Sequence, residues 1–392
     1  MTQHFSSFHW LLTQRLAGVT ASALRRLARF ERDGNNPELW LQWSSTRLKA
    51  AGVSELGIQS IADWQRGGSH SPAGEAALRD QRWLEESGAV LLPVTHPDYP
   101  PLLLEITDPP PLLYALGDST CLSAPQLAVV GSRRPTRQGV ADAATFAGAL
   151  AQAGFVVTSG LAQGIDAASH RAALDAGGKT VAVMGTGLDR IYPAANRDLA
   201  DMIRRSGALI TEFPLGTPPR AAHFPSRNRI ISGLSLGALV VEAAVKSGSL
   251  VTARLALEQN REVFAIPGSI HNPVSRGCNS LIRNGATLVQ DVRDILDQLM
   301  GWSGATLGEN ISATLSQTST RPAPLPIELP ADEAAVFAAI GFQPASLDTI
   351  LESVTLAVPA VLAALAELEL LGLLENRGGG YLRAEACAVS AG

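Results

Sequence analysis

Two arginines, Arg227 and Arg229, have the clearest capacity for binding chemistry in this sequence, and they lie in the stretch His-Phe-Pro-Ser-Arg-Asn-Arg at 223–229. The stretch also supplies an amide and a hydroxyl beside the two guanidinium groups. Pro225 disfavours a helix before it, and Ser226 is of the type that caps helices, so we expect a helix to begin just after it. Free N–H groups and the dipole at a helix start add to fixed positive charge. The stretch therefore predicts an anion site, and a loop with two solvated arginines is the alternative.

Short apolar runs rich in β-branched residues alternate with helical segments between residues 126 and 300. This alternation predicts a doubly wound, mostly parallel α/β sheet. In such sheets, ligands bind outside the carboxyl ends of the strands. We expect strands at 127–131, 155–159, 180–184, 208–213, 238–243, 262–266 and 286–289, and helices at 141–153, 166–176, 197–206 and 251–259.

Glycines, hydroxyl side chains and cations follow five of these expected strands. Glycines let backbone amides approach an anion, while Ser, Thr, Lys and Arg side chains donate hydrogen bonds to it. Five such loops at one edge of a sheet predict a phosphate-binding site. The candidate phosphate-binding residues are Gly131, Ser132, Arg133, Arg134, Gly160, Gln163, Gly164, Ile165, Asp166, His170, Gly185, Thr186, Phe224, Arg227, Asn228, Arg229, Ser232, Gly233, Lys246, Ser247, Gly248 and Ser249.

The type of phosphate ligand follows from motifs and from charge. The loop after the first strand lacks the G-x-G-x-x-G fingerprint of dinucleotide sites, and the chain has no Walker A motif. Residues 126–300 hold 18 Lys and Arg against 13 Asp and Glu, although the whole chain has a net charge of −5. A basic centre rimmed with arginine suits an open, repeated polyanion better than one enclosed nucleotide.

Helical or flexible segments flank this centre. Residues 1–80 predict a helical module, similar to a sterile-alpha-motif or helix–hairpin–helix module, with a packing or interaction role. The proline-rich segment 81–125 predicts an extended connector. Residues 301–330, rich in Ser, Thr, Gly and Pro, predict a flexible linker. Residues 331–386 predict three helices and a glycine-tipped hairpin, the pattern of a winged helix.

The third helix of the winged-helix-like segment, expected at 358–371, contains Glu367 and Glu369 and no Lys or Arg. Reading of the DNA major groove needs cationic or amide side chains on such a helix. We therefore expect this segment to bind proteins, with DNA binding as the alternative.

Composition also predicts a compartment. Three widely spaced cysteines show no metal-binding pattern and favour a reducing compartment. No apolar run reaches transmembrane length, and the first residues lack the basic start of a signal peptide. We expect a cytoplasmic protein with no membrane partner, no metal ion and no cofactor.

The motifs together resemble the bacterial DNA-processing protein A family (DprA, also Smf). The resemblance implies an extended Rossmann-like domain that binds single-stranded DNA as a homodimer. It also implies a role in natural transformation, in which the protein protects incoming DNA and helps to load the RecA recombinase onto strands coated with single-strand-binding protein. The motifs are Gly131-Ser132-Arg133, Ser159-Gly160, Gly164-Ile165-Asp166, His170, Gly185-Thr186-Gly187-Leu188-Asp189, Tyr192-Pro193, 224–235, Glu242-Ala243, 246–249 and Pro267-Gly268.

The resemblance also carries residue roles. It implies phosphate contacts at Ser132, Arg133, Arg134, Gly164, Arg227, Asn228, Arg229, Lys246 and Ser249. The chain departs from the family at Gln163, where many members carry a charged residue. A second departure is Ala194, where some members have lysine.

The alternative function is a nucleotide-processing enzyme, such as a nucleoside-monophosphate glycosidase, on a related fold. In those families a catalytic Glu accompanies a Pro-Gly-Gly-x-Gly-Thr motif, which the sequence after Pro267 lacks, so Glu242 is not expected to be catalytic. Asp166 and His170 could form an acid–base pair, but a capping role for Asp166 and a hydrogen-bonded His170 are favoured. Phe224 either stacks on a base or packs under the sheet. We expect no catalytic residue.

Overall fold

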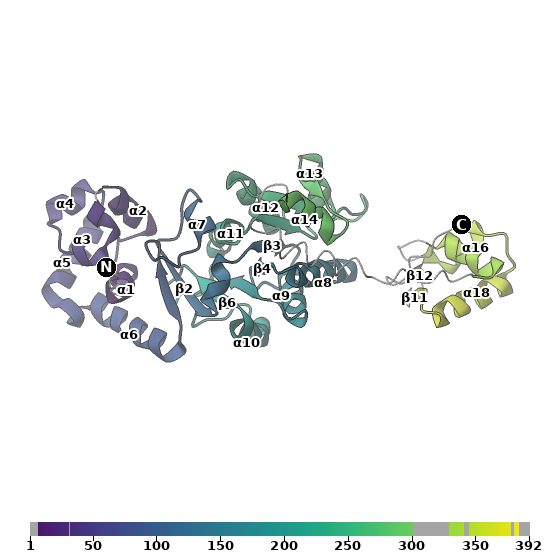
Figure 1. The fold of residues 1–392 in the computed structure, drawn as a ribbon, viewed down its shortest axis with the longest axis horizontal. Coiled ribbons are helices and arrows are strands. Elements are labelled where there is room, and N and C mark those ends of the chain that lie inside the picture. Colours follow the sequence, from purple (N-terminus) through teal and green to yellow (C-terminus); the bar gives the residue numbers. More distant parts are fainter. Residues whose placement is uncertain (1–6, 31, 301–328, 341–344, 378–379, 384–392) are drawn as a thin grey trace. The chain divides into compact units, whose positions relative to one another are not determined.

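The computed structural model describes residues 7–30, 32–300, 329–340, 345–377 and 380–383 (Figure 1). The chain forms two compact units, Met1–Thr314 and Leu315–Gly392. The first unit contains a large mixed sheet with helices on both faces, and an N-terminal group of helices packs at one end of it.

Nine strands form the large sheet, in the order β1-β2-β6-β5-β4-β3-β7-β8-β9. All neighbours from β6 to β9 pair in parallel, as the sequence predicts; for example, Ala128 lies between Thr158 and Ala238. The chain order reverses between β3 and β7. The strands are β1 (Val90–Pro93), β2 (Leu112–Gly117), β3 (Gln126–Val130), β4 (Val156–Ser159), β5 (Thr180–Val183), β6 (Ala208–Thr211), β7 (Gly237–Val240), β8 (Glu262–Ala265) and β9 (Thr287–Leu288).

Helices cover both faces of this sheet because alternate strand residues face opposite apolar cores. Ala182 and Leu209 belong to the core that α10 completes, whereas Val183 and Ile210 belong to the core beneath α11 and α12. Burial on both faces accounts for the nearly continuous apolar strand sequences. The helices after β3 are α8 (Arg137–Gln152), α9 (Ile165–Asp175), α10 (Arg197–Ser206), α11 (His223–Gly233), α12 (Gly248–Glu258), α13 (Arg276–Arg283) and α14 (Val292–Met300).

The N-terminal segment forms short helices, as the sequence predicts. Ser44, Ser54 and Ser71 each accept a hydrogen bond from the first turn of the helix that follows. Arg15 donates to both carboxylate oxygens of Asp80 at 2.6 Å, so the first and last helices of this group are joined. The elements are α1 (Ser7–Arg15), α2 (Ala21–Phe30), η1 (Arg32–Asn35), α3 (Pro37–Trp40), α4 (Ser45–Ala50), α5 (Glu55–Gly67), η2 (Gly68–His70) and α6 (Pro72–Ser87).

The segment 81–125 does more than connect. Besides α7 (Pro101–Leu104) and η3 (Ser119–Ser123), it contributes β1 and β2, which extend the sheet antiparallel beyond β6. The prolines lie outside these strands, except Pro93 at the end of the edge strand β1, where a missing N–H is tolerated. The many prolines of this segment led to the prediction of an extended connector, and the strand formed by the apolar run Leu-Leu-Tyr-Ala-Leu-Gly of β2 was not predicted.

In the part of the C-terminal unit that the structure describes, the elements are those that the sequence predicts, three helices and a hairpin. Its small sheet has the order β10-β12-β11 and shares an apolar core with the helices. Most of the predicted linker, 301–328, lies outside the described residues. The elements are α16 (Ala331–Ala339), β10 (Ala345–Ser346), α17 (Leu347–Ser353), α18 (Val358–Leu370), β11 (Leu374–Arg377) and β12 (Gly380–Arg383).

Within the described ranges, no single helix is long and apolar enough to cross a membrane. One pair of helices, α17 and α18, passes that test together by length and composition, although the two are bent by 114° at the break between them.

Candidate functional site

A cleft of about 840 Å³ opens at the carboxyl ends of β3 and β7, where the strand order reverses. This is the position at which doubly wound sheets bind their ligands. Its walls come from the loop after β3, the first turns of α11 and α12, and the loop that precedes each of these helices. The lining residues are Val130, Gly131, Ser132, Arg133, Arg134, Ala162, Asp166, Tyr192, Pro219, Ala221, Phe224, Pro225, Arg227, Asn228, Ile231, Ala244, Lys246, Ser247, Gly248, Ser249, Val251 and Thr252.

The charge of the cleft is predominantly positive. Arg133, Arg134 and Lys246 are exposed around it, and Arg227 lies at its floor. Of the described residues that line the cleft, Asp166 carries the one carboxylate. Its Oδ2 accepts hydrogen bonds from the backbone N–H groups of Gly160 (3.1 Å) and Ala162. The Asp166 carboxylate thus stabilises the loop after β4 through these hydrogen bonds. The exposed charged side chains of the cleft are all cationic.

Arg227 is almost completely buried, with 4% of its surface exposed. Its Nη1 donates to the carbonyl oxygens of Gly160 (2.8 Å) and Val183, which lie at the ends of β4 and β5. Burial lowers the pKa of the guanidinium to about 10, against the attraction of Asp166, so Arg227 is still charged at neutral pH. It ties α11 to the sheet and places a positive charge beneath the cleft.

Two glycines permit these close approaches. A Cβ at Gly160 would lie 2.6 Å from Nη2 of Arg227. Gly164 has φ +82°, and a Cβ there would lie 2.3 Å from the carbonyl oxygen of Ser132. That oxygen accepts the N–H of Ile165 at the start of α9. The loops after β3 and β4 therefore pack together through backbone contacts that side chains would block.

The start of α12 faces the cleft. Ser247 is its N-cap and accepts the N–H of Ser249 at 3.3 Å, while the two hydroxyl oxygens lie 2.7 Å apart. Gly248, Ser249, Val251 and Thr252, in the first two turns of α12, also line the cleft. The positive dipole end of this eleven-residue helix therefore lies at the cleft.

The second helix start differs from the sequence-based expectation. Helix α11 begins at His223 with Ala222 as N-cap, so the prediction that Ser226 caps a helix beginning after Pro225 is wrong. Pro225 lies in the first turn, where backbone N–H groups have no partner within the helix, so the missing donor costs little. Ser226 instead donates its hydroxyl to the carbonyl of His223.

An aromatic pair forms one wall of the cleft. The rings of Tyr192 and Phe224 lie 5.6 Å apart, and the Arg133 guanidinium lies 5.6 Å from the centre of the Phe224 ring. A Cβ at Gly185 would come within 3.0 Å of Phe224, so that glycine makes room for the ring. Phe224 thus lines the cleft and does not pack beneath the sheet. Tyr192, 47% exposed, was missed as a candidate although its motif was recognised.

Arg229 does not reach the cleft. Its Nε lies 2.9 Å from Asp108 and its Nη2 lies 2.6 Å from Glu212, and only 11% of its side chain is exposed. Arg229 and Arg227 are two residues apart in a helix, about 200° around its axis, so they point to different sides. The structure therefore separates the two arginines that the sequence pairs.

His170 is also outside the cleft and fully buried. Its Nδ1 lies 2.6 Å from the hydroxyl of Thr180, and burial, assisted by the charge of Arg227, lowers its pKa to about 3. The imidazole is neutral at physiological pH. Asp166 and His170 have separate partners, so they do not form an acid–base pair. Asp166 holds the loop after β4, and the predicted capping role is wrong, because the N-cap of α9 is Gly164 and it makes no side-chain hydrogen bond.

The other predicted residues outside the cleft have mainly structural surroundings. Gln163 and Gly164 line a neighbouring groove along α9. Thr186 donates to the carbonyl of Arg190, and Ser232 donates within its own helix. The remaining members of this group are buried and pack against neighbouring elements: Gly160, Ile165, Gly185 and Gly233.

Glu242 holds the start of a helix. Its two oxygens accept the backbone N–H of Thr136 at 2.9 Å and the Thr136 hydroxyl at 2.6 Å. Thr136 in turn caps α8 by accepting the N–H of Gly139. Both carboxylate oxygens are therefore engaged in capping α8.

Comparisons with known proteins agree with this architecture. Residues 90–300 match the family model of DNA recombination-mediator protein A, and residues 320–380 match the DprA winged helix domain. Protein Smf of Escherichia coli (strain K12) is 44% identical over 312 residues, which is 78% of this chain and 81% of that protein.

Solved structures agree as well. The X-ray structure of DNA processing protein A from Streptococcus pneumoniae has a TM-score of 0.63 and 36% identity, covering 74% of this chain and 97% of that chain. The Helicobacter pylori protein, whose structure is reported for its single-stranded DNA binding mode, has a TM-score of 0.50 and 30% identity, covering 54% and 96%. The chain belongs to the DNA recombination-mediator protein A (DprA/Smf) family, and its C-terminal unit is a winged helix domain.

Proposed function

We propose that this protein binds single-stranded DNA in the cleft between β3 and β7, and that it acts through this binding as a recombination mediator. The observation that carries the proposal is the set of exposed cations, Arg133, Arg134 and Lys246, around a cleft that also contains hydroxyl donors and the positive dipole end of α12. Such donors suit phosphate oxygens, and exposed cations suit a continuous backbone.

The aromatic wall supports a single strand over a duplex. Unpaired bases can stack on Tyr192 and Phe224, and stacking on an aromatic side chain is worth about 1–3 kcal/mol per base. Bases within a duplex present no free face for such contact. Arg133, above the Phe224 ring, would then contact phosphate while the ring contacts a base.

The nucleotide-processing alternative has weaker support. An enzyme of that kind needs a carboxylate or another polar group free to act on the substrate. Glu242 is engaged by Thr136, and Asp166 is engaged by two backbone amides. We therefore assign the cleft a binding role.

A salt titration tests the proposal. Fluorescence anisotropy of labelled oligo(dT), a duplex of equal length and dTMP should show tight, salt-sensitive binding of oligo(dT) only. Lys246→Ala should weaken that binding, whereas Arg254→Ala should not, because Arg254 is an exposed cation further along α12 that pairs with Glu258. Equal weakening by both variants would show that the cleft is not the site, and turnover of dTMP would favour the enzyme.

Membership of the family supports the finer steps of the proposal. We infer that a homodimer protects incoming strands in the cytoplasm during natural transformation. It would load RecA onto strands coated with single-strand-binding protein. Sedimentation velocity tests the dimer, and RecA-catalysed strand exchange on coated single strands tests the loading. Lys246→Ala should reduce the stimulation of exchange, and Arg254→Ala should leave it unchanged.

A further inference from the structure

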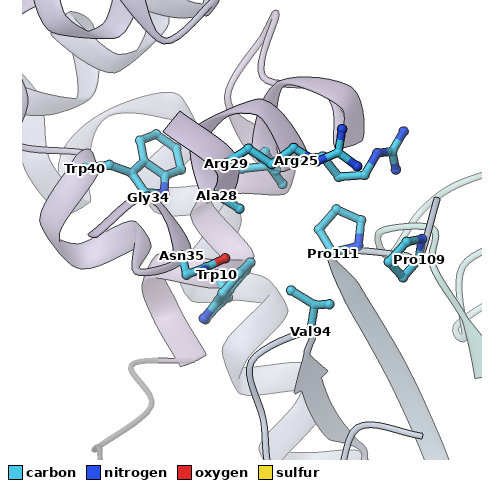
Figure 2. A pocket seen from close by; sticks show the side chains of 11 residues that line it. Trp10, Arg25, Ala28, Arg29, Gly34, Asn35, Trp40, Val94, Pro109 and Pro111 are labelled. Atoms are coloured by element: carbon cyan, nitrogen blue, oxygen red, sulfur yellow. The ribbon is translucent and has the colours of Figure 1, made fainter. Parts of the chain in front are cut away.

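A second cavity, of about 160 Å³, lies among the N-terminal helices and is separate from the cleft (Figure 2). We call it the Trp10 pocket. It is enclosed by α1, α2, η1 and α3 on one side and by the segment between β1 and β2 on the other. Its lining residues are Trp10, Leu24, Arg25, Ala28, Arg29, Gly34, Asn35, Trp40, Val94, Pro109 and Pro111.

The walls of the Trp10 pocket are mainly hydrocarbon. The indoles of Trp10 and Trp40 lie on one side, with Val94, Pro109 and Pro111 across from them (Figure 2). A dry apolar cavity of about 150 Å³ can hold a benzene molecule. The Trp10 pocket therefore has the size and the lining to hold one phenyl ring.

Its rim carries positive charge. Figure 2 shows the guanidinium groups of Arg25 and Arg29 close together on the side of Pro109 and Pro111. Nη1 of Arg25 is buried and has no hydrogen-bond partner among the residues that the structure describes. Glu212 attracts Arg25 at longer range, but its Oε2 accepts from Arg229 at 2.6 Å. A buried guanidinium nitrogen without a hydrogen-bond partner, beside an apolar cavity, favours a ligand that supplies a carboxylate.

We propose that the Trp10 pocket binds a partner protein through an acidic peptide segment, with one phenylalanine ring in the pocket and carboxylates on Arg25 and Arg29. Helix α2 has the sequence ASALRRLARF, which contains no acidic residue, and two of its arginines, Arg25 and Arg29, line the pocket, so this side of the pocket complements such a segment. A nucleobase fits less well, because its polar edge would be buried against a lining in which Asn35 supplies the one amide side chain.

This site adds to the proposed function and does not depend on it. The cleft would hold DNA, while the Trp10 pocket would recruit a protein. The two sites share no lining residue, so each can be removed without the other.

The test uses the full-length protein and a fluorescein-labelled decapeptide with four aspartates directly before one phenylalanine. We expect Arg25→Gln and Arg29→Gln each to weaken binding about tenfold, or 1.4 kcal/mol. Ala28→Phe should abolish it by filling the pocket. Arg26→Gln is the matched control on the same helix, because Arg26 donates to Ser22 and Gly52 and does not line the pocket. It should change binding less than twofold.

Two altered peptides and one competitor complete the test. Replacing the phenylalanine by alanine, or the aspartates by asparagine, should each weaken binding at least tenfold. An equal loss of peptide affinity in Arg26→Gln would show that the peptide is held by general charge attraction and not by the pocket. Tight binding of the peptide to Ala28→Phe would show that no ring enters the pocket. Displacement of the peptide by oligo(dT) would make the pocket a nucleic-acid site. If Ala28→Phe fails to fold, Ala28→Leu replaces it. All variants should keep wild-type affinity for oligo(dT).

Discussion

Arg133 and Arg229 provide a direct comparison of two arginines that differ in position but not in charge. Arg133 is exposed at the cleft and contacts the Phe224 ring. Arg229 is 11% exposed and held between Asp108 and Glu212. Replacing either by alanine removes one positive charge from the basic domain. If binding depended on overall charge alone, the two variants would behave alike.

The structure predicts opposite effects. Loss of one phosphate contact lowers the slope of log K against log salt by about 0.7 for a single strand. We expect that change in Arg133→Ala, with unfolding stability unchanged within about 0.5 kcal/mol. Removing one partner of a buried ion pair costs about 3 kcal/mol, so Arg229→Ala should lose stability and keep the wild-type slope.

The stability loss in Arg229→Ala should also depend on pH. Burial already raises the pKa of Glu212, and removal of Arg229 raises it further. A carboxyl whose pKa is raised in the folded state binds more protons there than in the unfolded state, so its cost grows as pH rises. The deficit should therefore be larger at pH 8 than at pH 5.

Two measurements decide the comparison. Anisotropy titrations of oligo(dT) at four salt concentrations give the slopes, and urea unfolding at pH 5 and pH 8 gives the stabilities. A reduced slope in Arg229→Ala with full stability would refute the placement of Arg229 outside the interface. An unchanged slope in Arg133→Ala would remove the loop after β3 from the binding site.

Four further predictions concern other parts of the chain. Gly160→Ala should displace Arg227, lowering stability by about 1–3 kcal/mol and weakening oligo(dT) binding, as urea unfolding and anisotropy would show. His170 has a folded pKa of about 3, so its proton uptake on unfolding makes stability fall as pH drops below about 6.5. His170→Asn should show a shallower fall in acid unfolding, by up to about 1.4 kcal/mol per pH unit. Truncation after Met300 should leave oligo(dT) affinity within about tenfold in gel shifts, since α18 offers no cation. Glu242→Gln should lower the melting temperature of the protein, because Glu242 holds Thr136 at the start of α8. Neither the wild-type protein nor this variant should turn over nucleotides.

The buried Arg227 shows how the fold and the site depend on each other. It donates to carbonyl oxygens at the ends of β4 and β5, and Gly160 lacks a side chain so that it can do so. The same guanidinium lies at the floor of a cationic cleft. Replacing Arg227 would disturb the sheet edge as well as the charge, so reduced DNA binding in such a variant would not by itself demonstrate a phosphate contact.

The local sequence pattern was sufficient to predict most of the strands of the α/β domain and the loops that follow them. After one polar residue at their start, Gln126 and Thr180, strands β3 and β5 are apolar because both faces of the sheet are covered, and that pattern is visible in the sequence. The glycine-rich and cation-rich loops after β3 and β7 were also recognisable, since parallel strands bring their carboxyl ends to one edge. Twelve of the predicted site residues accordingly line the cleft.

The sequence by itself thus determined the order of the elements, the edge of the sheet at which the cleft lies and the sign of the charge around it. Only the tertiary structure decided which cations line the cleft, because that depends on helix phase and on partners distant in the chain. Arg229 turns to Asp108 and Glu212, which no local pattern links to it. Likewise, β2 joins the sheet through β6, almost one hundred residues later, and the Trp10 pocket forms where α2 meets Pro109. Contacts between such separated segments depend on the packing of the whole domain, so the local periodicity of the sequence does not predict them.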